Sequence, residues 1–132
     1  MPTMPNLTLK KRRPVWYNLS PLALPLPGWV SIFHRISGVV LFFGLFWLLY
    51  LLDTSLQSPE SFERYKAAVS HPLAKLVLIG IIWAYLHHFC AGIRYLMHDM
   101  HMGDRLAPAR KSAGAVFIVS LILAAIIGVA IW

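Results

Sequence analysis

Long apolar runs separated by short polar stretches dominate this chain. Residues 29–52, 73–97 and 113–132 form three runs in which charged side chains are rare. Each run reaches the roughly 20 residues that a helix needs to cross about 30 Å of hydrocarbon at a rise of about 1.5 Å per residue. The pattern predicts an all-α membrane protein with three transmembrane helices, at 29–52, 73–97 and 113–132.

The two connections between these runs differ in character. In residues 53–72, Ser58, Pro59 and Glu60 supply a helix cap, a proline at the first helical position and an early acid, which together predict a short interfacial helix. Residues 98–112 contain Gly103, Pro108 and several charges, and predict a loop.

The N-terminal segment, residues 1–28, carries a basic cluster at residues 10–13. A proline-interrupted stretch follows this cluster, where a cleaved signal peptide would have a compact apolar core. We therefore expect the first helix to be retained in the protein.

Lysine and arginine positions predict the orientation in the membrane. Basic residues are concentrated in the N-terminal segment and in the second connection, whereas the first connection has only Arg64 and Lys66. Because short cytoplasmic loops carry the excess of lysine and arginine, we expect residues 1–28 and 98–112 to be cytoplasmic. The connection at 53–72 and the C-terminus would then lie on the external, periplasmic side.

Composition narrows the class of protein further. Of the 132 residues, 58% are hydrophobic and 13% charged, which fits one membrane unit better than a soluble domain. The net charge of +7 could suit nucleic acid, but the basic residues flank the apolar runs, so we assign them to orientation and to anionic lipid headgroups. The single cysteine, Cys90, lies inside an apolar run and excludes an intrachain disulfide or a cysteine-based metal site.

Polar side chains gather at the start of the first predicted span. Ser31, His34, Arg35 and Gly38 lie three or four residues apart and can share one helix face. A hydroxyl, an imidazole and a guanidinium at the edge of the hydrocarbon suit an apolar ligand with carbonyl or anionic oxygens, such as a quinone or a haem propionate. The alternative is that Arg35 is only a boundary anchor that reaches the interface.

Two adjacent histidines, His87 and His88, lie inside the second span. His88 has alanine or glycine at positions 84, 91 and 92, a surface flat enough for a macrocycle, whereas His87 has the bulky Trp83 four residues before it. Neutral imidazole is an axial ligand of haem iron, and this spacing favours His88 for that role. The alternative is that the small residues mark helix packing and the histidine bonds to a neighbouring helix.

No other span places a histidine at the depth of His88. His34 lies at the boundary, and the remaining histidines lie in or near the connections. A six-coordinate b haem would therefore need its second ligand from another chain. Near the cytoplasmic end of the same span, Asp99 and Arg94 lie at the depth of Arg35, and Asp99 can neutralise an arginine, relay protons or remain a solvated acid.

Together these residues resemble the cytochrome b subunit of succinate dehydrogenase, often called its C subunit. Two motifs carry the resemblance over nearly the whole chain: Arg13-Pro14-Val15 followed by Ser31-x-x-His34-Arg35-x-Ser37-Gly38, and His88-x-x-x-Gly92-Ile93-Arg94 ending in Asp99. The third span carries no motif. Tyr95 stands where many members have histidine, and His98 where an aromatic residue or methionine is usual.

The resemblance implies a place in complex II, which feeds electrons from the tricarboxylic acid cycle into electron transport. It implies His88 as the axial haem iron ligand, Ser31 and Arg35 as quinone-binding residues, and His34, Arg35 and Asp99 as haem propionate contacts or proton relays. A second membrane subunit would share haem b, and a flavoprotein and an iron–sulfur protein would dock on the cytoplasmic face of a bacterial inner membrane. Ubiquinone would be the substrate.

Two further readings remain open from the sequence. A fumarate reductase anchor can share the same helices and histidines, because the direction of the reaction depends on redox potentials that the chain does not display. The second alternative is a structural membrane anchor that binds no haem. A channel or transporter is less consistent with a third span that contains no charge.

Overall fold

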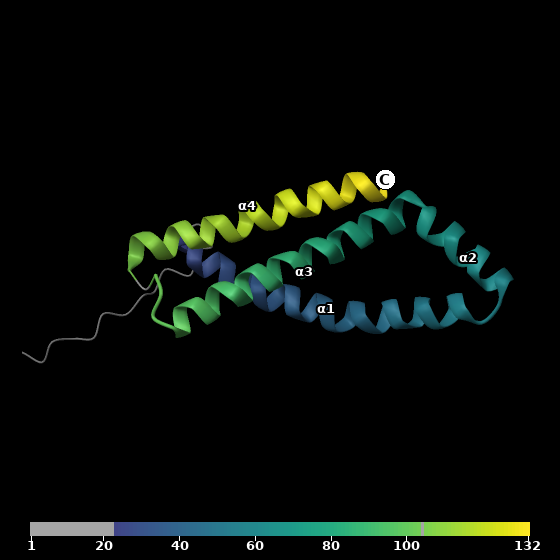
Figure 1. Cartoon of the computed structure of the whole chain (residues 1–132), viewed down its shortest axis with the longest axis horizontal. Helices are drawn as coiled ribbons and strands as arrows, with labels where there is room; N and C mark the ends of the chain where they lie inside the picture. Colours follow the sequence, from purple (N-terminus) through teal and green to yellow (C-terminus); the bar gives the residue numbers. More distant parts are fainter. Residues whose placement is uncertain (1–22, 104) are drawn as a thin grey trace, which may run out of the picture.

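The computed structural model describes residues 23–103 and 105–132, which form four helices and no strand. They are α1 (Leu26–Leu56), α2 (Pro59–Ser70), α3 (Pro72–Asp99) and α4 (Leu106–Ile131). Helices α1, α3 and α4 are each long and apolar enough to cross a membrane. Figure 1 shows α4 running alongside α3 and α1 crossing α3 at an angle, with the short α2 joining the ends of α1 and α3. The prediction of an all-α protein with three transmembrane helices is confirmed.

The predicted short helix in the first connection is also present, and its cap explains where it begins. The Ser58 side chain accepts a hydrogen bond from the Ser61 backbone N–H at 3.1 Å, and Ser61 Oγ accepts one from the Ser58 N–H at 2.9 Å. Pro59 occupies the first helical position, where its missing N–H costs no helical hydrogen bond.

The second connection is shorter than expected. Residues 98–112 were predicted to form a loop, but α3 continues to Asp99 and α4 already begins at Leu106. The turn is made by His101 and Gly103, which both have positive φ. Pro108 does not delay α4, because proline is tolerated in the first turn of a helix.

Helix ends do not mark the surfaces of a bilayer. The membrane-embedded limits at 29–52, 73–97 and 113–132 therefore remain predictions, as do the cytoplasmic and external assignments of 1–28, 53–72 and 98–112. The basic cluster at residues 10–13 and the Arg13-Pro14-Val15 motif lie outside the described residues.

Small side chains line the interior of the bundle. Along α4 the buried residues recur at helical spacing: Ala113, Val116, Ser120, Ala124 and Gly128. Small residues let membrane helices approach closely, and a Cβ on Gly128 would already lie 3.4 Å from Ile79 Cδ1. Large side chains such as Phe42, Phe43 and Phe46 instead point outward. The chain therefore keeps a wide apolar surface for lipid or another subunit.

Candidate functional site

His88 lies where α3 meets the first turns of α1. Its Nδ1 is 3.0 Å from the backbone oxygen of His34 and 3.2 Å from Ser37 Oγ. A carbonyl oxygen can only accept, so Nδ1 carries the proton and donates it. The other ring nitrogen, Nε2, is then left with its lone pair. This is the arrangement in which metal-bound histidines are commonly held.

The ring of His34 completes this arrangement from the side. It stacks on His88 with centroids 4.0 Å apart and planes 11° apart. It also lies edge-on to Tyr95, at a centroid distance of 5.2 Å. His34 was expected at the boundary and not at the depth of His88, but the stacked rings lie at one level. The structure thus joins His34 of the first predicted cluster to His88 of the second.

Gly38 allows α1 to approach the His88 ring closely. A Cβ at this position would lie 3.1 Å from His88 Cε1, closer than ordinary packing permits. Gly38 therefore sets the separation between the imidazole and α1.

His87 faces the opposite way and is enclosed. It is 0% exposed, and aromatic rings surround it, from Phe33, Trp83 and Phe117. The Val30 backbone lies near this ring, but neither ring nitrogen meets the geometry of a hydrogen bond with the described residues. A ligand from outside the chain cannot reach this ring, so the geometry favours His88 over His87 as a haem ligand. Trp83 forms one wall of this enclosure.

The alanines near His88 pack inside the bundle and do not form a surface for a cofactor. Ala84 and Ala91 were expected to offer a flat surface for a macrocycle, but both are buried in the bundle on the same face of α3 as His87. They are packing residues, as the alternative proposed. Gly92 lies near His34, with Nε2 4.0 Å from its Cβ position.

The predicted quinone residues remain at the surface of this site. Ser31 is half-buried and Arg35 exposed, and within the described part of the chain neither makes a hydrogen bond or ion pair through its side chain. Asp99 is exposed, and no ion pair joins it to Arg35 or Arg94 in that same part. The structure thus brings together His34 and His88 but leaves Ser31, Arg35 and Asp99 without partners from the described chain.

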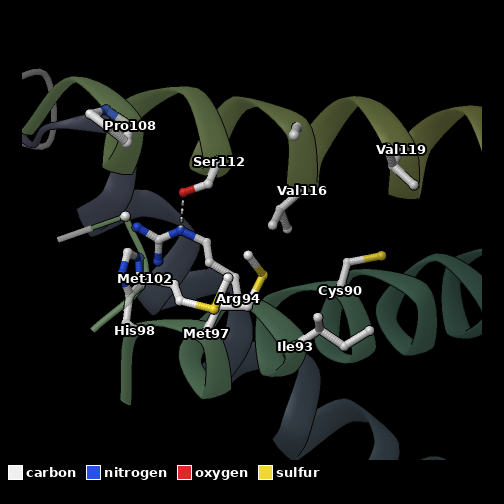
Figure 2. Close-up of a pocket in the computed structure, with 12 residues that line it drawn as sticks. Cys90, Ile93, Arg94, Met97, His98, Met102, Pro108, Ser112, Val116 and Val119 are labelled. Atoms are coloured by element: carbon white, nitrogen blue, oxygen red, sulfur yellow. Dashed lines mark hydrogen bonds between the residues drawn. The ribbon is translucent and has the colours of Figure 1, made fainter. Parts of the chain in front are cut away.

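Arg94 turns away from His88 toward α4. Its Nε donates to Ser112 Oγ at 3.0 Å and its Nη2 to the Ala109 carbonyl at 3.3 Å, as Figure 2 shows for Ser112. Arg94 was predicted to lie in one layer with Arg35 and Asp99. That prediction concerns its position along α3, whereas its side chain lies on the face of α3 that meets α4.

Ser37 and Tyr95 are the site residues for which the sequence suggested no role. Ser37 is 4% exposed and its hydroxyl donates to the His34 carbonyl at 2.9 Å. The Tyr95 hydroxyl is buried without a hydrogen-bond partner in the described residues. Ser37 stands in the first motif and Tyr95 directly follows Arg94 of the second, but the sequence did not show the contact of Ser37 with His88, because that contact crosses between helices.

Comparison with known proteins shows the family to which this chain belongs. Residues 10–127 match the model of the succinate dehydrogenase/fumarate reductase transmembrane subunit. Because the match covers most of the chain, this protein belongs to that family.

Particular relatives narrow the comparison. The chain is similar to the succinate dehydrogenase cytochrome b556 subunit of Coxiella burnetii, with 37% identity over 94% of this chain and 100% of the relative. The corresponding subunit of Paracoccus denitrificans is 33% identical over 85% of this chain and 86% of its own length. These names agree with the resemblance carried by the two motifs. They identify the relatives as membrane subunits of an oxidoreductase complex, and "cytochrome b556" implies haem b in them.

Proposed function

We propose that this chain is the haem-b-binding anchor subunit of a bacterial succinate dehydrogenase and helps to form its quinone-reduction site. One observation carries the haem assignment. His88 Nδ1 donates to the His34 carbonyl at 3.0 Å, so its Nε2 is the ring nitrogen left to bind iron. His88 is only half-buried, and its Nε2 is not among the buried side-chain nitrogens that lack a hydrogen-bond partner.

The residues around His88 fit a haem that is shared with another subunit. Among residues 23–103 and 105–132, no group of three or more histidine, cysteine or acidic side chains could hold a metal by itself. His34 stacks beside His88 and does not oppose it, and His87 is enclosed. The second axial ligand would come from a companion membrane subunit, for which the outward Phe42 and Phe46 of α1 offer contact surface. Haem b, when bound, supplies a one-electron carrier.

Contacts with the propionates would come from the first turns of α1. His34 offers an imidazole beside His88, and Arg35 offers a guanidinium that makes no ion pair within the described chain. Guanidinium groups bind carboxylates through two parallel hydrogen bonds. These two residues would therefore fix the edge of the macrocycle while His88 fixes its centre.

The same end of the bundle would bind ubiquinone. The Ser31 hydroxyl can donate to a quinone carbonyl, and the Arg35 guanidinium can stabilise the negative charge that develops on oxygen during reduction. Reduction consumes two electrons and two protons for each quinone. The electrons would come from succinate through a flavoprotein and an iron–sulfur subunit, and the protons from the cytoplasmic side, with Asp99 as a relay.

This function fixes an orientation in the bacterial inner membrane. The N-terminus and the turn between α3 and α4 would face the cytoplasm, where the two electron-transfer subunits dock, and the C-terminus would face the periplasm. Exposed Arg105, Arg110 and Lys111 near the start of α4 favour the cytoplasmic side for that end.

The absorption spectrum of the purified complex tests the assignment. We expect a Soret band and an α-band that sharpen on reduction, as a low-spin b haem gives. A complex that contains this chain and its partners but shows no such bands would leave only a structural anchor.

The remaining alternative is a complex that works in the opposite direction and reduces fumarate, because the family description includes fumarate reductases. We expect the complex to oxidise succinate with a quinone acceptor faster than it reduces fumarate with a quinol donor. The opposite ratio would assign it to fumarate reduction without changing the role of His88.

A further inference from the structure

A cavity of about 450 Å³ opens between α3 and α4, on the side of α3 to which Arg94 turns. Figure 2 shows the residues that line it, with Arg94 and Met97 from α3 facing Ser112 and Val116 from α4. Ser31, His34, Arg35 and His88 do not line it. It is therefore separate from the haem and quinone site.

Arg94 brings a charge into this cavity that nothing in the described chain neutralises. The residue is only 7% exposed. Its Nε and Nη2 donate to the neutral oxygens of Ser112 and Ala109. No carboxylate of residues 23–103 or 105–132 forms an ion pair with it. These neutral acceptors take two of the five guanidinium N–H groups. The guanidinium also lies 5.6 Å from the centre of the Tyr95 ring, but no carboxylate of the described chain balances its charge. A buried charge at membrane depth normally has a counter-charge.

The lining of the cavity changes from polar to apolar along the helices. Arg94, His98 and Ser112 lie at the end nearest the α3–α4 turn, and Cys90 and Val119 lie at the other end. From Ser112 to Val119 the helix rises roughly 10 Å. Met97 and Met102 add flexible, polarisable side chains at the end nearest the turn.

This gradient discriminates between possible anions. A free inorganic anion, or a carboxylate side chain of another protein, would use only the polar end. An anionic glycerophospholipid would use both ends, because its phosphate carries the charge and its acyl chain covers the apolar wall.

The surroundings of the polar end favour the same ligand. Arg105, Arg110 and Lys111 lie on the turn and the first turns of α4, and all are exposed. Clusters of basic residues at a membrane surface attract anionic lipids. A lipid phosphate would therefore meet basic side chains both outside the cavity and within it.

We propose that the cavity between α3 and α4 binds one acidic phospholipid, with its phosphate at the Arg94 guanidinium and an acyl chain along the wall formed by Val116 and Val119. The lipid supplies the counter-charge of Arg94. It also fills the space that the small residues of α4 leave on this face. This proposal does not rest on haem or quinone binding.

Titration of the delipidated, assembled complex with phosphatidylglycerol and phosphatidylcholine of identical acyl chains tests this site, with native mass spectrometry to count bound lipid. We expect one phosphatidylglycerol to bind at least about tenfold more tightly than phosphatidylcholine, since only the former adds a net charge to pair with Arg94. Arg94→Gln should remove about tenfold of that affinity, the contribution of a charge-assisted hydrogen bond. Arg110→Gln, an equal change of charge at an exposed position outside the cavity lining, should change it much less.

A second variant keeps Arg94 and fills the apolar end. Ala115 is exposed and lines the cavity, so Ala115→Trp should also lower phosphatidylglycerol binding while leaving all charges in place. Size-exclusion chromatography establishes that each variant complex is assembled, and Ala115→Trp decides the test if Arg94→Gln does not assemble. Equal binding of the two lipids would overturn the proposal, as would unchanged phosphatidylglycerol binding in Ala115→Trp. Displacement of the lipid by millimolar inorganic phosphate would show a site for a free anion instead.

Discussion

His34 contacts His88 in two ways at once. Its ring lies parallel to the His88 ring with centroids 4.0 Å apart, and its backbone oxygen accepts a hydrogen bond from His88 Nδ1 at 3.0 Å. The stacking fixes the plane of the imidazole, and the hydrogen bond fixes which nitrogen carries the proton. Helix α1 therefore prepares the nitrogen that α3 would present to iron.

Substitution of this imidazole should remove the haem. We expect His88→Ala to abolish the α-band of the reduced complex, because no other histidine of the described chain takes its place beside α1. Absorption spectra of the purified complex, normalised to the total amount of protein, measure the effect. Haem retained at the wild-type level would move the axial ligand to another residue.

The neighbouring histidine provides the matched control. His87→Phe removes two ring nitrogens that make no hydrogen bond in the described residues, from a site walled by Phe33, Trp83 and Phe117. A buried polar group without a partner costs about 1–3 kcal/mol. We therefore expect unchanged haem content and a complex that is at least as resistant to thermal unfolding, measured by the temperature at which the haem spectrum is lost. A His87→Phe complex without haem would give His87 a direct role that its burial does not suggest.

Features of the fold that depend on residues close together in the sequence could be predicted, and features that depend on contacts between helices could not. The three long helices depend only on the apolar composition of each run, and the α2 cap depends on residues within one turn of Ser58. Both are local, and both predictions are confirmed. The placement of His88 against His34 was not predicted, because His34 was expected at the boundary and not at the depth of His88, yet the two rings stack with centroids 4.0 Å apart.

Contacts between helices were the part that could not be predicted. Ala84 and Ala91 flank His88 in sequence, but the rotation of α3 against α1 and α4 places them with His87 in the interior. The same rotation directs Arg94 to Ser112. A single helix pattern shows which residues share a face but not which neighbour that face meets, and the Ser37 contact with His88 was missed for this reason.

Gly38 should control the geometry of the haem ligand. A Cβ there would lie 3.1 Å from His88 Cε1, so Gly38→Ala must shift either the imidazole or α1. Disturbing a group that orients a metal ligand typically weakens metal binding by about 10- to 100-fold. We expect faster loss of haem during purification and a changed α-band or midpoint potential in the haem that remains.

Gly44→Ala is the control for this substitution. Gly44 lies on α1, six residues after Gly38. A Cβ on Gly44 would make an ordinary 3.7 Å contact with Ile81 Cδ1 of α3. Haem content and spectrum should then match the wild type. If both glycine variants lose haem equally, helix association and not the imidazole position explains the effect.

Ser31→Ala and Arg35→Ala should separate quinone chemistry from succinate oxidation. The two side chains make no hydrogen bond or ion pair within the described chain, so we expect their removal to leave the fold intact. Loss of a single group that stabilises charge on a reacting oxygen typically costs about 100-fold or more in turnover. We expect quinone reduction to fall by about that factor while reduction of a soluble artificial acceptor by succinate stays near the wild-type rate. Ser55→Ala, at an exposed hydroxyl that bonds only its own helix, controls for loss of a serine in α1. An equal fall of both activities would indicate failed assembly of the complex, and unchanged quinone reduction in both variants would remove Ser31 and Arg35 from the quinone site.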